Sequence, residues 1–498
     1  MTTTIKTSVS RRQFLQTTAV ATAGIPFINC GKVDVAKPMT REFGRLGFDV
    51  TTLSLGGQAS IQWTPDDVDP VRIILKSFDS GINYFDTSNA YGPSQLNYGK
   101  AFQALNLIPG KAGYDEPLRR SIFLTTKTGL RWSKGGREIE GVRSFSNGPD
   151  CTHTVDDIKR TLSQVFGDGN GYYPPGAYID MILIHSLSEM AQIDVLYEGY
   201  DNPDPKAEHI GALAGLMDYR DGTNLTGLNP QEEKLIRHIG FSGHRSPAAM
   251  MEMIRRDTKN ILDGMLVAIN ANDRLNFNMQ YNVIPVAAAK NMGVIAMKTF
   301  ADGAMYTKEA NWSSKPEHVV RTVGNEIVPS RSLVEYTLTT PGVHTAIIGI
   351  GQIDDNQQAC QIAQNMSSAQ VAAGGLTEGD RRGIEKMANA VKGGETNYFQ
   401  LPHEELSPPN EPSIEHEQQN GRRVVTLSWH SAYAGDEPVV SYEIWGNNVK
   451  MDQVDHSPQT TMQPFTYKDM GENEGVKSYK IVAVDAAGRT AATDELSL

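Results

Sequence analysis

Short apolar runs alternate with helix-like amphipathic stretches along most of this chain. After a hairpin and strand expected within 43–57, strand candidates lie at 82–86, 122–127, 179–185, 236–242, 264–270, 294–298 and 345–349. Nearly continuous apolar strands separated by helices imply an α/β fold with a parallel sheet. Eight such units fit a closed (β/α)8 TIM barrel, whose active site lies at the C-terminal ends of the strands. An open doubly wound sheet is the alternative, but no Gly-x-Gly-x-x-Gly follows the first strand.

Helices and long loops are expected between these strands. Apolar spacing predicts helices at 70–80, 155–166, 247–254 and 282–292. Thr154 and Asp157 form a capping-box pattern at the start of the second of these helices. Three long Gly/Asn/Pro-rich stretches follow strands and are expected to lie over the active-site face as loops: 129–152, 187–230 and 301–330. They either shape a substrate pocket or are disordered.

The composition changes after about residue 400. A Pro-rich linker at 406–412 leads into short alternating strands at 424–429, 440–445 and 479–485, which predict a small all-β sandwich over 408–498. This part resembles a fibronectin type III module, with Trp429 as its core Trp and Tyr479 as its core Tyr. It has no ionisable cluster, so it is interpreted as a spacing module or as one that contacts a glycan or a protein.

The first residues carry an export pattern. Arg11 and Arg12 precede Phe-Leu and a modest apolar stretch at 17–28, which predicts a twin-arginine signal peptide over 1–31. The protein is therefore expected to be periplasmic or otherwise exported. Cleavage near Ala23 is one possibility, and lipidation of Cys30, which would make a membrane-anchored lipoprotein, is the other.

Charge and cysteine content narrow the function classes. The net charge is −12 and the pI is near 5.5, which argues against nucleic acid or an anionic membrane surface as a partner. Three Cys residues allow at most one disulfide, so the fold must rest on core packing.

Four ionisable side chains stand at or just after the ends of successive strand candidates. Asp86 ends one strand, Tyr91 follows it in a Gly-terminated loop, Lys127 ends the next strand and His185 the one after. This order resembles the catalytic tetrad of the aldo-keto reductases, and the region of about 40–400 resembles that family. The Gly-Phe-Ser-Gly-His run at 240–244 is similar to one subgroup of it.

The resemblance implies hydride transfer between a nicotinamide cofactor and a small carbonyl or sugar-like alcohol. Tyr91 would be the general acid/base. Lys127, paired with Asp86, would lower the pKa of Tyr91, since a nearby ammonium favours the phenolate. His185 would hydrogen-bond the substrate oxygen and orient it.

The resemblance also carries over a nicotinamide site. Ser242 would contact the carboxamide, with Gly243 in place of the more usual Asn. Asn270 is the candidate for the family's Gln on the sixth strand. The run from Gly293 through Met297 to Lys298 also resembles the subgroup, and many relatives stack an aromatic on the nicotinamide at about this point, which Met297 cannot do in the same way.

The rest of the cofactor would lie at the last barrel strand. Backbone groups near Gly349 and Gly351 would hold phosphates, and Asn356 would read adenine.

NAD or NADP would fit this site, and NAD is favoured. Asp354 and Asp355 would repel a 2′-phosphate, and this loop has no Lys or Arg. Arg331 or Arg381 could reach the phosphate from elsewhere and reverse that preference.

Two further sets of residues are candidate sites. Cys151 and His153 are two apart, but two ligands do not make a metal site and no partner pair is found, so no metal is predicted. His244 either holds the backbone of its turn or contacts substrate.

Two alternatives to an ordinary reductase stay open. Because an exported enzyme cannot easily exchange its nucleotide, the cofactor could stay bound while hydride is taken and returned, as in an epimerase or lyase. The barrel could also be a catalytically silent scaffold for binding or adhesion. The three long stretches contain no motif that identifies the substrate.

Overall fold

The computed structural model describes residues 37–321, 324, 327–354, 360–471 and 475–498. The predicted signal peptide with Cys30, and Asn356, lie outside these described residues. Within them, no helix is long and apolar enough to cross a bilayer.

Eight parallel strands close into a barrel in the order in which they occur along the chain, with the last pairing with the first. They are β3 (Leu53–Leu55), β4 (Tyr84–Asp86), β5 (Phe123–Thr128), β7 (Ile179–Leu187), β9 (Ile236–Gly243), β10 (Leu262–Ala268), β11 (Gly293–Met297) and β12 (Thr345–Ile348). The predicted (β/α)8 barrel is therefore confirmed, and the open doubly wound sheet is excluded.

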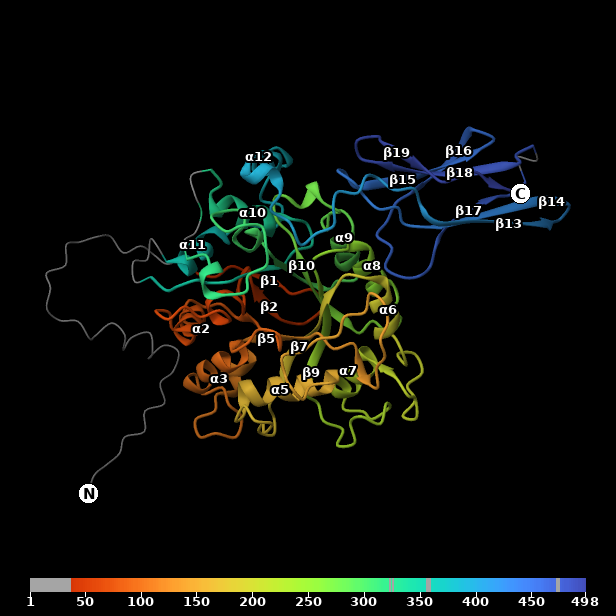
Figure 1. Ribbon diagram of the computed structural model, residues 1–498. Coiled ribbons are helices and arrows are strands. Elements are labelled where there is room, and N and C mark those ends of the chain that lie inside the picture. Colours follow the sequence, from red (N-terminus) through yellow and green to blue (C-terminus); the bar gives the residue numbers. More distant parts are fainter. Residues whose placement is uncertain (1–36, 322–323, 325–326, 355–359, 472–474) are drawn as a thin grey trace, which may run out of the picture.

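Helices surround the barrel (Figure 1). They are α2 (Pro70–Asp79), α3 (Ser94–Ala104), α4 (Glu116–Arg120), α5 (Thr154–Phe166), α6 (Met190–Leu196), α7 (Ala212–Asp221), α8 (Pro247–Arg255), α9 (Val283–Ala289), α10 (Ser330–Thr339), α11 (Gln361–Ser368) and α12 (Glu378–Asn389). Four of them match the expected ranges to within a few residues. Local signals explain some of their boundaries: Asp69 accepts bonds from the first turn of α2, and Pro70 opens that helix.

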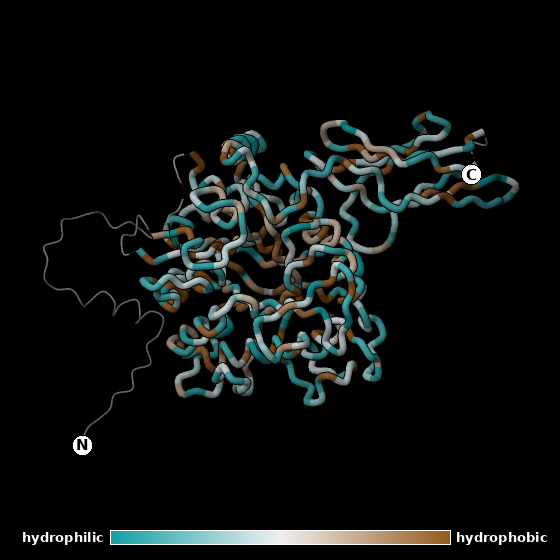
Figure 2. The backbone as a smooth tube through the Cα atoms, in the orientation of Figure 1, coloured by the Kyte–Doolittle hydropathy of each residue, from teal (hydrophilic) through white to brown (hydrophobic). Residues whose placement is uncertain are grey.

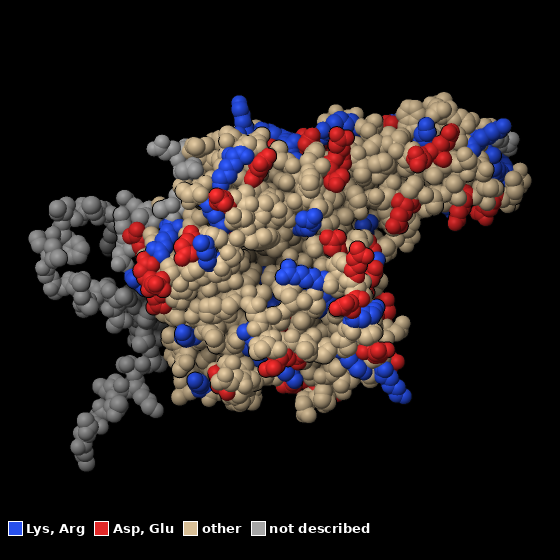
Figure 3. Space-filling model, viewed as in Figure 1, with Lys and Arg blue, Asp and Glu red and all other residues tan. Residues whose placement is uncertain are grey.

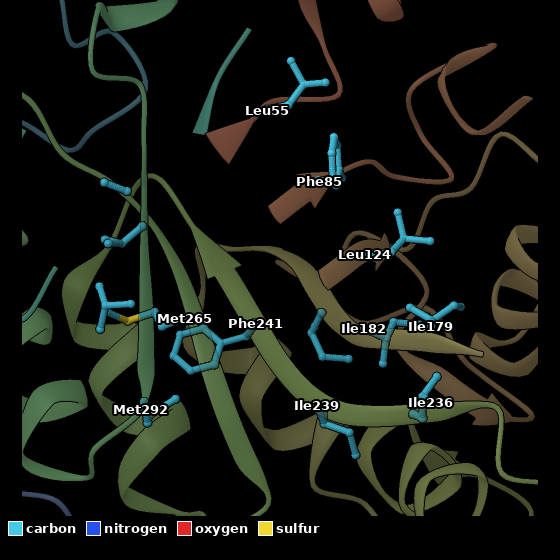
Figure 4. Packing of buried hydrophobic residues seen from close by; sticks show 14 of the residues in the cluster. Leu55, Phe85, Leu124, Ile179, Ile182, Ile236, Ile239, Phe241, Met265 and Met292 are labelled. Atoms are coloured by element: carbon cyan, nitrogen blue, oxygen red, sulfur yellow. The ribbon is translucent and has the colours of Figure 1, made fainter. Parts of the chain in front are cut away.

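Residue alternation along the strands separates two cores. Phe85, Leu124 and Ile182 point outward and pack under the helices, as in the cluster of Figure 4. Tyr84 and Phe123 point inward. Segments of apolar residues accordingly lie mainly in the centre of the barrel domain (Figure 2).

The N-terminal hairpin closes the bottom of the barrel. It consists of β1 (Thr40–Glu42) and β2 (Asp49–Thr51), which pair antiparallel. Phe43 in its turn contacts Tyr84 and Phe123 edge-on, with ring centroids 5.8 and 5.6 Å away. The bottom is thus sealed by aromatic packing, which leaves the opposite end for a site.

Two of the three long connections contain more regular structure than expected. Residues 187–230 contain α6, α7 and β8 (Ile210–Gly211), and β8 pairs with β6 (Trp132–Lys134) of the 129–152 connection. Their prediction as loops is wrong there, because Gly, Asn and Pro between the short elements hide the apolar spacing. The capping prediction also shifts: α5 begins at Thr154, and Asp156 accepts a bond from the backbone N–H of His153 at 2.8 Å.

The C-terminal part forms two antiparallel sheets that share one core. One sheet holds β13 (Asn410–Gln419), β14 (Arg422–His430) and β17 (Phe465–Asp469). The other holds β15 (Val439–Gly446), β16 (Val449–Asp455), β18 (Ser478–Asp485), β19 (Thr490–Ala492) and β20 (Leu496–Ser497). Trp429 and Tyr479 are buried between them, as an all-β sandwich requires.

This sandwich sits against the α8 and α9 side of the barrel (Figure 1). Asn282 at the start of α9 exchanges hydrogen bonds with the backbone of Ala434, at 2.9 and 3.1 Å. Arg274 donates to the carbonyl oxygen of Asp436. Acidic and basic side chains alternate over both parts on the face shown in Figure 3, without a single-sign patch.

Candidate active site

Because side chains alternate between the two faces of a strand, three of the predicted catalytic side chains point into the barrel. Asp86 lies two residues after inward-facing Tyr84, and Lys127 and His185 have the same parity on β5 and β7. All three stand near the C-terminal ends of their strands. The same alternation therefore brings Asp86, Lys127 and His185 together at the upper end of the barrel.

Asp86 and Lys127 form a buried ion pair. The ammonium nitrogen lies 2.7 Å from both carboxylate oxygens and 2.9 Å from the carbonyl oxygen of Thr87. Burial raises the pKa of Asp86 and lowers that of Lys127, and their mutual attraction opposes both shifts.

Tyr91 joins this pair from the loop after β4. Its ring lies edge-on to that of His185 at 5.8 Å, and the Lys127 ammonium lies 4.5 Å from its centroid. Asn89, two residues earlier, fixes the loop by donating to the carbonyl oxygen of Asp157 and the hydroxyl of Thr161 on α5. The four predicted catalytic residues are thus gathered in one place.

The pKa of Tyr91 is raised well above its ordinary value, first by burial and then by the charges of Asp86 and Asp302. The prediction that Lys127 lowers this pKa is wrong for this geometry. Lys127 faces the ring and shares its charge with Asp86, so it does not offset the loss of water around the phenol oxygen. Tyr91 is therefore a neutral phenol.

His185 is neutral as well. Burial lowers its pKa well below the ordinary value, and the charge of Lys127 adds to this effect. Its Nδ1 lies 3.3 Å from the hydroxyl of Ser88, and Arg131 donates to its carbonyl oxygen at 2.8 Å. The ring is thus oriented from both its side chain and its backbone.

A cavity of about 140 Å³ opens beside Tyr91 and runs to α11. Its walls come from the ends of β3, β4, β11 and β12, from the 301–330 connection and from α11. The lining includes Gly57, Trp63, Asp86, Tyr91, Met297, Lys298, Thr299, Asp302, His318, Val320, Gly349, Gln361 and Asn365.

The cavity walls hold polar atoms that have no partner among the described residues. They include the hydroxyl of Thr299 and the amide oxygen of Asn365, both buried. Because buried polar atoms are normally hydrogen-bonded, these two indicate a site for an elongated polar ligand. A dinucleotide fits that requirement, with one end at Tyr91 and the other at α11.

The predicted cofactor residues divide into two groups. Met297, Lys298 and Gly349 line the cavity as expected. Gly351 supports it from behind: its N–H donates to Gln361 at 2.7 Å, and its carbonyl accepts from Ser60. A Cβ on Gly351 would lie 2.3 Å from the carbonyl oxygen of Val320, so only glycine fits there.

Two predicted carboxamide contacts have protein partners instead. The hydroxyl of Ser242 accepts from the backbone N–H of Ser186 at 2.9 Å. Asn270 forms a reciprocal amide pair with Asn397, at 2.9 and 3.0 Å, and also donates to the carbonyl oxygen of Lys298. Its oxygen further accepts from the N–H of Asn272, so Asn270 has no group left for a nicotinamide and its predicted role is not supported.

Several site residues were not found from the sequence. Asn365 lies nine positions after Asn356 and forms part of the cavity wall at α11. A residue that hydrogen-bonds adenine, at the far end of the cofactor, is expected at this place. An Asn in an amphipathic helix carries no signal of its own, but its place one turn after cavity-lining Gln361 would have been a clue.

Asp302 is a second missed residue. It accepts from the hydroxyls of Ser313 and Tyr398 at 3.1 Å each, and lies 3.4 and 3.3 Å from the ammonium groups of Lys298 and Lys308. The charges of the two lysines lower its pKa despite burial. This cluster folds the start of the 301–330 connection over the end of β11, so that connection shapes the pocket.

Residues 318–321, called the strap below, close one side of the cavity. Gln361 donates to the carbonyl oxygen of Val320 at 3.3 Å. Arg321 forms a two-point pair with Asp67, at 2.7 and 2.6 Å. The strap is therefore tied both to α11 and to the connection after β3.

The other residues considered as metal ligands or as partners of a 2′-phosphate lie away from this site. Cys151 is half-buried near Asp157, and His153 precedes α5. Arg381 is buried against Tyr336 and donates to its carbonyl oxygen, and Arg331 pairs with Glu335. Neither arginine lines the cavity.

Comparison with known proteins agrees with this geometry. Residues 52–373 match the Aldo/keto reductase family. Among solved structures, the chain is similar to an aldo-keto reductase from Bacillus halodurans in its holo form, with 18% identity, a TM-score of 0.40, and coverage of 71% of this chain and 97% of that one. It is also similar to an aldo/keto reductase from Klebsiella pneumoniae in complex with NADP and acetate, with 15% identity, a TM-score of 0.42, and coverage of 71% and 96%. The family match spans more than half of the sequence, so the chain belongs to the aldo/keto reductase family.

Proposed function

We propose that the protein reduces a small carbonyl compound, or oxidises the corresponding alcohol, with a nicotinamide cofactor. Family membership supports an NAD(P)-dependent oxidoreductase. The observation that carries the specific reaction is the position of Tyr91, a buried neutral phenol beside His185 and at the wall of the cavity.

In the reductive direction the carbonyl carbon gains a hydride and the oxygen gains a proton. A bound nicotinamide would supply the hydride. Tyr91 donates the proton, which its raised pKa keeps on the phenol oxygen at neutral pH. His185 donates a hydrogen bond to the same oxygen and fixes its direction. Lys127 and Asp86 hold the ring of Tyr91 in place from below.

The cavity residues have separate parts in holding the cofactor. Asn365 would accept a hydrogen bond from adenine, and Thr299 would bond the phosphates or ribose. Met297 would give a flexible, polarisable apolar surface in place of an aromatic ring. We favour NAD over NADP, because Arg321, which follows the cavity-lining residues of the strap, is already engaged by Asp67.

A closed-cycle enzyme that retains its cofactor is the second candidate. The strap supports it, because it is tied to two separate walls of the cavity and would slow nucleotide exchange. In such an enzyme the hydride would be removed from and returned to one substrate.

We also propose that the chain is exported through its twin-arginine segment, with Cys30 as a lipid-anchor candidate. The C-terminal sandwich would be a fibronectin type III-like module that contacts a glycan or another protein. The Arg pair at 11–12 supports the first proposal, and the buried Trp429 and Tyr479 support the second.

Nucleotide binding tests the proposed function. The purified protein is denatured and any released nucleotide is identified by mass spectrometry, and the emptied or empty protein is titrated with NAD(H) and NADP(H). Stoichiometric retained nucleotide supports the closed-cycle enzyme, and reversible binding of added nucleotide supports the exchanging reductase. A protein that neither holds nor binds any of the four nucleotides is the silent scaffold, and the proposal is then wrong.

A further inference from the structure

A second buried imidazole, His244, lies next to His185. His244 follows β9 directly, and His185 lies near the end of β7, the neighbouring strand, with Leu187 paired to Gly243. Their side chains are 8% and 9% exposed for His185 and His244, respectively. Ser186, the residue after His185, has its hydroxyl 3.4 Å from the Nδ1 of His244, so the two histidines stand at neighbouring strand ends.

The two rings are held in the same way. The Nδ1 of His185 lies 3.3 Å from the hydroxyl of Ser88, and the Nδ1 of His244 lies 3.4 Å from that of Ser186. Ser186 is itself fixed by the bond from its N–H to Ser242. Within the described part of the chain, the Nε2 of neither imidazole has a hydrogen-bond partner. Each ring therefore has one nitrogen tied to the protein and one left for a ligand.

An aromatic ring covers each histidine. Phe145 lies 5.4 Å from His185, and Trp312 lies 5.4 Å from His244. Trp312 is 52% exposed although it sits between His244 and the ammonium of Lys298. A large indole left in solvent beside a catalytic pocket is typical of a surface that a ligand covers.

The second histidine is uncharged. Burial, with the charges of Lys298 and Lys127, lowers the pKa of His244 to about 3. A neutral imidazole whose Nδ1 is engaged can donate a hydrogen bond through Nε2 or accept one there, depending on its tautomer. A hydroxyl, which can both donate and accept, matches either tautomer, so the partner of His244 is expected to be a hydroxyl.

We propose that His244 is a specificity-determining residue that hydrogen-bonds the hydroxyl on the carbon next to the reacting carbonyl, while His185 bonds the carbonyl oxygen itself. The substrate class is then an α-hydroxy aldehyde or ketone, and Trp312 packs against the carbon skeleton of the sugar that carries it. This inference rests on the proposed reduction, and it goes further by naming the group beside the reacting carbon.

Glycolaldehyde and acetaldehyde test it, because they differ by that one hydroxyl. Each is reduced by the full-length protein with NADH and with NADPH, and kcat/KM is measured. We expect glycolaldehyde to be preferred by about tenfold or more, since a buried site left without its hydrogen bond discriminates at least this strongly. His244→Ala should reduce the preference to below about threefold, with acetaldehyde turnover and nucleotide affinity little changed. His244→Gln, which can still bond a hydroxyl, should restore part of the preference.

His238→Ala is the matched control. His238 lies on the same strand, β9, but bonds Asp263 at the other end of the barrel, so its loss should leave the preference unchanged. Equal kcat/KM for the two aldehydes in the unmodified protein would overturn the inference and leave the reductase standing. An equal fall in kcat/KM for both aldehydes in His244→Ala would assign His244 a structural role and would also overturn the inference. If neither aldehyde is reduced although nucleotide binds, both the proposed reduction and this inference are wrong.

Discussion

Tyr91 is held in its proton-carrying form by its surroundings. Burial and the carboxylates of Asp86 and Asp302 all raise its pKa. A phenol that keeps its proton suits the reductive direction, in which the substrate oxygen has to receive one. In this direction Lys127 helps by placing the ring, since its ammonium lies over the ring face.

The pH dependence of reduction follows from these neutral groups. Because the pKa of His185 is lowered well below its ordinary value, His185 does not become charged as the pH falls through about 6.5. The pKa of Tyr91 is raised, so Tyr91 does not lose its proton below about pH 10. We predict that kcat/KM for reduction is constant between about pH 6 and pH 9. A step in this profile near pH 6.5 would show that His185 titrates there and would contradict the assignment.

The Asp86–Lys127 pair is also a stability element. Lys127→Met would leave the Asp86 carboxylate buried without its partner and should lower the free energy of unfolding by about 3–5 kcal/mol. The double variant Asp86→Asn with Lys127→Met should recover most of this stability but no activity. Urea unfolding followed by fluorescence measures both. If the single variant is as stable as the unmodified protein, the pair is not buried as described.

At the scale of elements, we expect the strap to limit access to the cavity, because it lines one side of it and is tied at two points. The exposed Arg321–Asp67 pair is one of its two ties, and exposed pairs contribute little each. We predict that Arg321→Ala speeds nucleotide dissociation by about two- to fivefold, and that high salt has the same effect on the unmodified protein. Stopped-flow displacement of bound nucleotide measures the rate.

Arg331→Ala is the control for that experiment. Arg331 also forms an exposed pair, with Glu335 on α10, but it does not line the cavity. Its replacement should leave the dissociation rate unchanged. If both variants release nucleotide at the unmodified rate, the strap does not limit exchange, and the case for a retained cofactor is weakened.

The barrel and the gathering of its four candidate catalytic side chains were predictable from the sequence because both depend on local patterns. Apolar runs reveal the strands, and a polar residue such as Lys127 or His185 at the end of such a run falls on the inward face by alternation. Residues placed by packing between distant segments were not predictable. Asn270 is an example, since its partner Asn397 lies 127 positions away.

Burial and packing explain the remaining differences between the sequence-based predictions and the structure. The sequence suggested that Lys127 would lower the pKa of Tyr91, but the depth of the phenol decides the direction, and depth is a property of the closed barrel. Asn365 and Asp302 reach the site from α11 and from the connection after β11. Their positions depend on how those segments pack against the barrel, and the neighbouring residues in the sequence give no signal for this packing.

At the scale of the whole molecule, residues beyond the family match contact the site end of the barrel. The match ends at residue 373, yet Tyr398 bonds Asp302, and Phe399 lies 6.5 Å from Trp312 at the mouth of the site. The chain then leads directly into the sandwich, which is fastened to the barrel through Asn282. The two parts are therefore expected to unfold together.

Asn282→Ala tests that coupling. The variant leaves the N–H of Ala434 without its partner and leaves the carbonyl of Ala434 with only the longer bond from Asn278, at 3.5 Å, so it should lower the free energy of unfolding by about 1–3 kcal/mol. We predict one calorimetric transition for the unmodified protein and separation into two for the variant. Asn170→Ala, in an exposed turn, should change stability by less than about 0.5 kcal/mol. Two transitions in the unmodified protein would show that the sandwich is an independent unit.

The most direct test of the account compares Tyr91→Phe with Tyr98→Phe in single-turnover reduction of an aldehyde by the nucleotide-loaded protein. Both changes remove a buried phenol hydroxyl, but that of Tyr98 has no partner among the described residues and faces the core. The account predicts that Tyr91→Phe slows the chemical step by about 10²–10⁴-fold with unchanged nucleotide affinity, and that Tyr98→Phe has no effect on either. Equal rates for Tyr91→Phe and the unmodified protein would contradict the assignment of Tyr91 as the proton donor.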